Sequence, residues 1–212
     1  MTVQGRPAAG MARAALMAIP VGVAAWAVIF AWQPINFWVL MTVGVGGLGA
    51  LAVRIRGPFP FAEGARWSDL LLGAAASVLL YAVFAAGRAG ADRLLPFAAS
   101  QVSAVYTLRT QAPAWFIVVV LALVIGPGEE LFWRGLVQWG LVQRLGSGRG
   151  WGAAAILYGL VHIAALNAML VLAAAVAGAF WGWLYLRIGR IAPVVVSHIL
   201  WDLTVFLIFP FQ

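Results

Sequence analysis

Long apolar runs separated by short polar segments dominate this chain. Seven runs come close to the length of about 20 residues that a helix needs to cross the hydrocarbon core of a bilayer. They are Ala14–Trp32, Ile35–Val53, Leu70–Gly87, Pro113–Gln138, Trp151–Leu166, Ala168–Leu186 and Ile191–Phe209. We expect the fourth helix to continue toward Arg144, beyond the membrane. The pattern predicts an all-α, polytopic transmembrane helical bundle with about seven spans, eight being the alternative count.

The amino-acid composition extends this prediction to the whole chain. Hydrophobic residues make up 65% of the 212 residues and charged residues 9%, whereas soluble domains are about 45–50% apolar and about 25% charged. We therefore expect residues 1–212 to form a single integral membrane domain. The chain has no cysteine, which excludes disulfides, thiolate catalysis and cysteine-bound metals.

The arginines predict how the chain is oriented. All 13 basic residues are arginine, and all of them except Arg134 flank the apolar runs. We therefore expect contacts with membrane lipids and no nucleic-acid partner, although the formal net charge is +7. One side of the membrane holds nine of them: Arg6, Arg13, Arg54, Arg56, Arg66, Arg144, Arg149, Arg187 and Arg190. The other side holds Arg88, Arg93 and Arg109, so the positive-inside rule places the N-terminus in the cytoplasm.

Two further features bear on location and on the loops. The absence of lysine and the abundance of Ala, Gly and Arg suggest a GC-rich bacterial genome, and hence a bacterial plasma membrane. The segment Arg88–Ala112 is the least hydrophobic part of the chain. It is either a simple connector or a lid or interfacial helix.

Two glycine patterns indicate close helix packing. Gly44–Gly49 fits the GxGxxG pattern, but it lies inside an apolar run, without the preceding strand and following acidic residue that a dinucleotide site requires. Gly178 and Gly182 have the GxxxG spacing of close helix pairs. The second contact could lie within the bundle or between chains.

Both histidines and three of the six acidic residues lie inside the predicted spans: Glu129, Glu130, His162, His198 and Asp202. A charge at the bilayer centre costs about 3 kcal/mol, and such groups normally face a bundle interior or a cavity and serve a function. Each taken alone also fits a structural role, as a hydrogen-bonded packing histidine or a helix-clamping Glu–Arg pair. Their combination favours one functional site.

The first polar group follows a Gly-Pro-Gly sequence at positions 126–128, which should kink or interrupt the fourth helix and open space. Glu130 precedes Arg134 by four residues, the favourable order for an intrahelical ion pair. Glu129 points about 100° away from Glu130 around the helix. We predict a supporting Glu130–Arg134 pair and Glu129 as the available base.

The second and third polar groups repeat the four-residue spacing. Tyr158 and His162 share one face of the fifth helix, and His198 and Asp202 share one face of the seventh. Asp202 could orient His198 or share a proton with it. At a rise of about 1.5 Å per residue, both histidines lie about 10–17 Å below the predicted cytoplasmic boundary, with Glu129 at a compatible depth. We expect the three helices to converge on one cavity that opens to the cytoplasm.

These residues resemble the CAAX protease and bacteriocin-processing family, also called the Abi family, which contains the type II CAAX prenyl endopeptidases. The shared pattern is Glu-Glu-x-x-x-Arg, then aromatic-x-x-x-His and His-x-x-x-Asn/Asp on successive transmembrane helices. Tyr158 stands where the family commonly has Phe, and Asp202 where the prenyl-protease branch has Asn. The resemblance covers residues 113–209, the expected catalytic core.

The resemblance implies an intramembrane endopeptidase for a hydrophobic peptide or membrane-protein substrate, in CAAX-type or peptide-precursor processing. Glu129 and His162 would activate a water, while His198 and Asp202 would stabilise the oxyanion. Since an ionised Asp202 would repel an oxyanion, it would have to be protonated or keep His198 cationic. The supporting residues would be Glu130, Arg134 and Tyr158.

Three alternatives stay open at this stage. The leading hypothesis needs no cofactor, but in a zinc-dependent version Glu129, His162 and His198 would hold Zn²⁺ with an open water position. Intramembrane Glu, His and Asp beside a broken helix also describe a proton-coupled transporter, although no inverted repeat is evident. The third alternative is a non-catalytic immunity or scaffold protein of the membrane.

Overall fold

The computed structural model describes residues 8–57 and 66–211, and within these ranges every regular element is a helix. The all-α prediction is therefore confirmed. Five helices are long and apolar enough to cross a membrane: Gly10–Trp32, Phe37–Arg56, Trp67–Leu94, Ala114–Leu145 and Ala168–Ile188. Ala192–Ile208 is a shorter apolar helix. The polytopic bundle is thus confirmed, while Arg6, which counted toward the orientation, lies outside the described residues.

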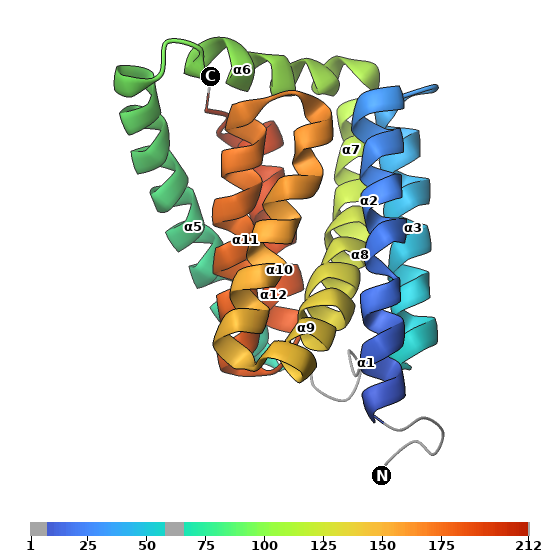
Figure 1. The fold of residues 1–212 in the computed structure, drawn as a ribbon. Coiled ribbons are helices and arrows are strands. Elements are labelled where there is room, and N and C mark those ends of the chain that lie inside the picture. Colours follow the sequence, from blue (N-terminus) through green and yellow to red (C-terminus); the bar gives the residue numbers. More distant parts are fainter. Residues whose placement is uncertain (1–7, 58–65, 212) are drawn as a thin grey trace.

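Two antiparallel helical columns form one side of the bundle (Figure 1). The first contains α1 (Ala8–Met17), α2 (Ile19–Ala27) and a π-helical turn (Val28–Trp32). The second is α3 (Phe37–Arg56), whose first turn is capped by Asn36: its side chain accepts hydrogen bonds from the backbone N–H groups of residues 38 and 39.

The segment Arg88–Ala112 is helical and is not a simple connector. It contains the end of α5 (Trp67–Leu94), then α6 (Ala98–Tyr106) and a 3-10 turn (Thr107–Gln111). The last two lie across the ends of the other helices, as an interfacial helix would (Figure 1). Hydrogen bonds fix them there: Asn167 donates to the carbonyl of Gln101 at 2.8 Å, and Trp38 to that of Leu108 at 2.8 Å.

The fourth predicted span is one long helix that does continue toward Arg144. It consists of α7 (Ala114–Val120), a π-helical segment (Leu121–Ile125), α8 (Gly126–Glu130), a second π-helical segment (Leu131–Gln138) and α9 (Trp139–Leu145). The Gly-Pro-Gly sequence therefore does not interrupt the helix. It lies in α8, between two π-helical segments of the kind often found at functional sites.

The space that we expected beside Gly-Pro-Gly is filled. A Cβ atom at Gly128 would lie 2.9 Å from the carbonyl oxygen of Val45, and one at Gly126 would lie 2.8 Å from the side chain of Ile199. The two glycines let α8 approach α3 on one face and α12 on another. Gly49 contributes to the same contact, since its Cβ would lie 3.0 Å from the Cα of Gly128. The packing role predicted for the GxGxxG pattern is confirmed.

The last third of the chain forms three antiparallel helices. They are α10 (Ser147–Val161) with a 3-10 turn (His162–Ala165), α11 (Ala168–Ile188), and α12 (Ala192–Leu203) with a π-helical turn (Thr204–Ile208). α10 packs along α11, and α12 packs along α5. A Cβ at Gly178 would lie 2.8 Å from the ring of Tyr158, so the GxxxG pattern serves packing within the bundle.

Candidate active site

The first and third motifs meet at the carboxylate of Glu130, which is fully buried. Its Oε1 accepts a hydrogen bond from Nη1 of Arg134 at 2.9 Å, the intrahelical pair that the spacing predicts. The same oxygen accepts a second bond from Nδ1 of His198 at 2.6 Å. Glu130 therefore also links α8 to α12, a contact that the sequence does not reveal.

The first and second motifs meet at Glu129. The hydroxyl of Tyr158 on α10 donates to Oε2 of Glu129 at 2.6 Å. Glu129 is buried, with 5% of its surface exposed. Its other oxygen, Oε1, makes no hydrogen bond within residues 8–57 and 66–211. The two neighbouring glutamates thus differ as the sequence predicts: Glu130 neutralises Arg134, and Glu129 keeps one carboxylate oxygen available.

Arg134 is a buried cation surrounded by compensating groups. Besides its ion pair with Glu130, it donates from Nη2 to the carbonyl of Gly178 at 3.4 Å. Its guanidinium carbon lies 4.5 Å from the ring centroid of Tyr158 and 5.4 Å from that of Trp181. Such cation–π contacts strengthen when water is excluded. The arginine therefore joins α8, α10 and α11 around the two glutamates.

His198 lies between two carboxylates and against an aromatic face. Its Nδ1 donates to Glu130, and its Nε2 lies 3.5 Å from Oδ2 of Asp202. Its ring stacks on Trp181 with centroids 3.9 Å apart. Because both ring nitrogens face carboxylate oxygens, the arrangement is that of a doubly protonated imidazolium. Asp202 is the more distant partner, so Glu130 rather than Asp202 provides the short bond that orients His198.

His162 is hydrogen-bonded to Trp26 and Tyr158 and not to Glu129. Its Nε2 accepts a hydrogen bond from the indole N–H of Trp26 on α2 at 3.1 Å, and its Nδ1 donates to the carbonyl of Tyr158 at 2.7 Å. An indole can only donate and a carbonyl can only accept, so the ring is a neutral imidazole with its proton on Nδ1. Within the described residues, no hydrogen bond joins His162 directly to Glu129.

This arrangement does not match the zinc site of the alternative hypothesis. Both ring nitrogens of His162 are hydrogen-bonded, and both of His198 face carboxylates. In the part of the chain that the structure describes, no three His, Cys, Asp or Glu side chains come together as a metal site. Zinc binding by Glu129, His162 and His198 would require His162 to leave Trp26.

Two tryptophans at the site, and one ion pair elsewhere in the bundle, escape sequence reasoning. Trp26 and Trp181 occur in apolar helices that contain many other aromatic residues, and no spacing distinguishes them. Asp69 is buried near the start of α5 and forms an ion pair with Arg190, just before α12. Asp69 is an acidic residue at the beginning of an apolar run, and this feature of the sequence could have indicated that it has a basic partner.

The cytoplasm-facing cavity stays a prediction. One cavity, of about 170 Å³, lies beneath α6 and is lined by residues that include Phe30, whose ring centroid is 5.5 Å from that of His162. A second, of about 460 Å³, lies at the same end of the bundle. Neither of these two is lined by Glu129 or by either histidine.

Comparison with known families covers the region that contains these motifs. Residues 110–204 match the family model described as type II CAAX prenyl endopeptidase Rce1-like. The matched range includes all the polar motif residues, whereas α1–α3 lie outside it. The family resemblance predicted from the motifs is therefore confirmed, and the match supports a CAAX-type intramembrane protease. No match was found among curated proteins or among solved structures.

Proposed function

We propose that this chain, which carries an Rce1-like domain over residues 110–204, is an intramembrane endopeptidase that hydrolyses a peptide bond by a glutamate-activated water. The observation that carries the proposal is the joining of all three motifs into one buried network: Tyr158 binds Glu129, and Arg134 and His198 both bind Glu130. Amide hydrolysis needs a base, an electrostatic partner for the oxyanion and a proton for the leaving amine.

Glu129 is the proposed general base. Tyr158 holds its Oε2, so Oε1 takes a proton from a water molecule whose oxygen attacks the carbonyl carbon of the scissile peptide bond. The proton then passes from Glu129 to the departing amine nitrogen as the C–N bond breaks. The carboxylate is thereby regenerated, and the products are a free carboxylate and a free amine.

His198 is the proposed partner of the oxyanion. The short bond from Glu130 and the stacked ring of Trp181 fix its orientation, so that its Nε2–H can donate to the developing negative charge. Asp202, 3.5 Å from Nε2, supports the cationic form of the ring without having to touch the oxyanion itself. The sequence left two possibilities beside an oxyanion, a protonated Asp202 or an Asp202 that keeps His198 cationic, and we propose the second.

We propose a smaller contribution of His162 to water activation than the sequence suggests. Its Nε2 already accepts a hydrogen bond from the indole N–H of Trp26, so it can bind the water only by exchanging one donor for the other. We therefore assign the base function to Glu129 and a supporting function to His162.

Replacement of Glu129 by Gln tests this assignment. The amide keeps the size of the side chain and can still accept from Tyr158, but it cannot take a proton from water. Since a general base contributes about 10²–10⁴-fold to a rate, we expect cleavage to fall by at least about 100-fold. Purified protein in detergent would be given a farnesylated CAAX peptide and unmodified hydrophobic peptides, with the products identified by mass spectrometry.

The matched control is Asp92→Asn, which removes an acidic group from the exposed end of α5. Its cleavage should equal that of the unmodified protein. Each protein would be assayed with and without a strong chelator, which separates a glutamate mechanism from a zinc mechanism. Full activity of Glu129→Gln would contradict the proposed base, and loss of activity with chelator would contradict the metal-free reaction.

A further inference from the structure

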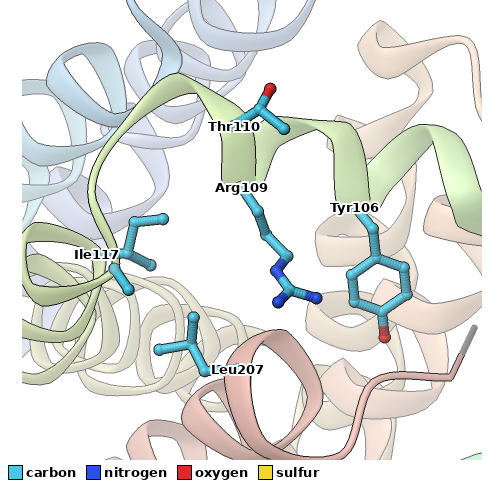
Figure 2. Close-up of a pocket in the computed structure, with 6 residues that line it drawn as sticks. Tyr106, Arg109, Thr110, Ile117 and Leu207 are labelled. Carbon is cyan, nitrogen blue, oxygen red and sulfur yellow. The ribbon is translucent and has the colours of Figure 1, made fainter.

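A cavity of about 460 Å³ lies at the α6 end of the bundle, apart from the three motifs (Figure 2). It is an open pocket bordered by the end of α6 and the 3-10 turn after it, by the start of α7 and by the last turn of the helix that begins as α12. Its lining residues are Tyr106, Arg109, Thr110, Ala114, Ile117 and Leu207. Figure 2 shows the guanidinium of Arg109 pointing into the pocket, with Ile117 and Leu207 on one side of it and Tyr106 on the other.

Arg109 differs from the other partly or fully buried arginines in the described ranges. Three of those form ion pairs: Arg88 with Asp92, Arg134 with Glu130, and Arg190 with Asp69. Another, Arg56, donates to the carbonyl of Gly135. Arg109 is half-buried and has neither a hydrogen-bond acceptor nor an acidic partner in the described part of the chain. A half-buried guanidinium without a partner is a favourable binding position for an anion, because charge-assisted hydrogen bonds to it are strong.

The polar wall of the cavity offers one further donor. The hydroxyl of Tyr106 accepts the backbone N–H of Phe211 at 2.9 Å, and its own proton is free to donate. Burial raises the pKa of Tyr106, so the phenol stays protonated. The hydroxyl of Thr110 already donates to the carbonyl of Thr107. No acidic side chain lines the cavity.

The surroundings of the cavity are apolar and exposed. On α7, Trp115 is 67% exposed and Val119 is 45% exposed; past the end of the last helix, Phe209 is 63% exposed. In a helical membrane protein such surfaces face lipid, and Trp is enriched at the level of the headgroups. Acyl chains can therefore lie against both walls while a headgroup reaches the guanidinium.

We propose that this cavity binds the phosphodiester of a membrane phospholipid, with Arg109 as its principal ligand and Tyr106 as a second donor. A phosphate accepts two parallel N–H bonds from one guanidinium, and the acyl chains of the same molecule continue along α7 and the last turn of the bundle. The site is independent of the proposed peptidase activity, because none of its residues belongs to the catalytic network.

Native mass spectrometry of the whole protein in detergent tests the site. Titration with phosphatidylglycerol should give a discrete one-lipid complex. In Arg109→Gln its affinity should fall about tenfold, the loss expected for one charge-assisted contact, and Arg109→Lys should lie between the two. The matched control is Arg93→Gln, an equal loss of charge at an exposed position on α5, which should bind as the unmodified protein does.

Four results would overturn the site. The first is unchanged lipid binding by folded Arg109→Gln. The second is binding of diacylglycerol, which has no phosphate, as tight as that of phosphatidylglycerol. The third is equally tight binding of glycerol phosphate, which has no acyl chains. The fourth is displacement of the lipid by a free-acid peptide but not by its C-terminal amide, which would assign the cavity to a substrate carboxylate. Circular dichroism of each variant separates loss of the site from loss of the fold.

Discussion

The two histidines of the chain are held in different protonation states by their contacts. His198 lies between Glu130 and Asp202, whereas His162 accepts a hydrogen bond from the indole N–H of Trp26 and donates one to the backbone carbonyl of Tyr158. Trp26 is fully buried on α2, far from the motifs in the sequence. It fixes which nitrogen of His162 carries the proton, so a side chain outside the family match sets the chemistry of a motif residue.

Trp26→Phe removes the indole N–H and keeps an aromatic ring. A neutral hydrogen bond is worth about 1 kcal/mol, so the Nδ1–H tautomer of His162 should lose about fivefold in relative population. Nitrogen NMR of protein labelled at histidine measures this, because the two rings are the only histidine signals. The His162 nitrogens should shift toward a mixture of tautomers, with those of His198 unchanged.

Trp133→Phe is the matched control for this experiment. Trp133 packs against Trp26 with ring centroids 5.4 Å apart and is equally buried, but its indole N–H has no hydrogen-bond partner in the described residues. Its replacement should leave the His162 spectrum as it was. Identical spectra for Trp26→Phe and the unmodified protein would show that the indole does not select the tautomer, whatever the enzyme cleaves.

The polar residues of the site were predictable from the sequence, and their partners were not. Glu129, His162 and His198 stand out because charge is costly inside an apolar helix. The four-residue spacing predicted the Glu130–Arg134 pair, which the structure contains. The bonds from His198 to Glu130 and from Trp26 to His162 join residues 68 and 136 positions apart. Such pairings depend on the relative orientation of packed helices. The periodicity of a single helix does not determine that orientation.

At the level of elements, α8 depends on glycine for its position. Gly128 lies against the backbone of Val45 on α3, where a methyl group would come within 2.9 Å of a carbonyl oxygen. Backbone atoms cannot rotate away as a side chain can, so the helices must separate to admit it. The two glutamates follow directly after this glycine and move with it.

Gly128→Ala should therefore destabilise the protein, by about 1–3 kcal/mol as in other overpacked cores. It should also lower peptide cleavage, because the displacement reaches Glu129. Gly87→Ala is the control: this glycine lies on an exposed face of α5 with no atom near its Cβ position, and helix propensity alone should stabilise the protein by about 0.5–1 kcal/mol. Unfolding in sodium dodecyl sulfate, followed by circular dichroism, gives both values, and equal stability of the two variants would contradict the contact.

The helix boundaries were largely predictable because apolar runs of the required length are rare outside membrane spans. The sixth run, Ala168–Leu186, corresponds to α11 at Ala168–Ile188. The effect of Gly-Pro-Gly was not predictable. Whether such a sequence breaks a helix or admits a close neighbour depends on what packs against it, and here Val45 and Ile199 occupy the space.

For the whole molecule, the family match covers only part of the packed unit. Phe132 and Trp133 from the matched region are buried against α1–α3, and a Cβ at Gly22 would lie 2.7 Å from the ring of Phe132. The N-terminal helices are therefore a wall of the site and not an accessory anchor. Removing them would expose these aromatic rings and leave His162 without its donor.

A chain that begins at residue 66 should consequently fail to form the active bundle. We expect it to aggregate on size-exclusion chromatography in detergent and to cleave none of the peptides. Co-expression with residues 1–57 should restore a monodisperse complex and cleavage, since helices inserted separately can associate in a bilayer. A monodisperse, active fragment without its partner would show that α1–α3 do not support the site.

The sharing of Glu130 between Arg134 and His198 has a consequence for biogenesis. The Glu130–Arg134 pair lies within one helix, so this segment can enter the bilayer with that charge already neutralised. His198 arrives on α12, which is synthesised after the other described helices. Under the proposed mechanism, the oxyanion partner His198 is missing until α12 docks, while the proposed base Glu129 is already in place. A nascent chain of the proposed peptidase should therefore stay inert toward neighbouring membrane proteins until α12 has been synthesised and has docked.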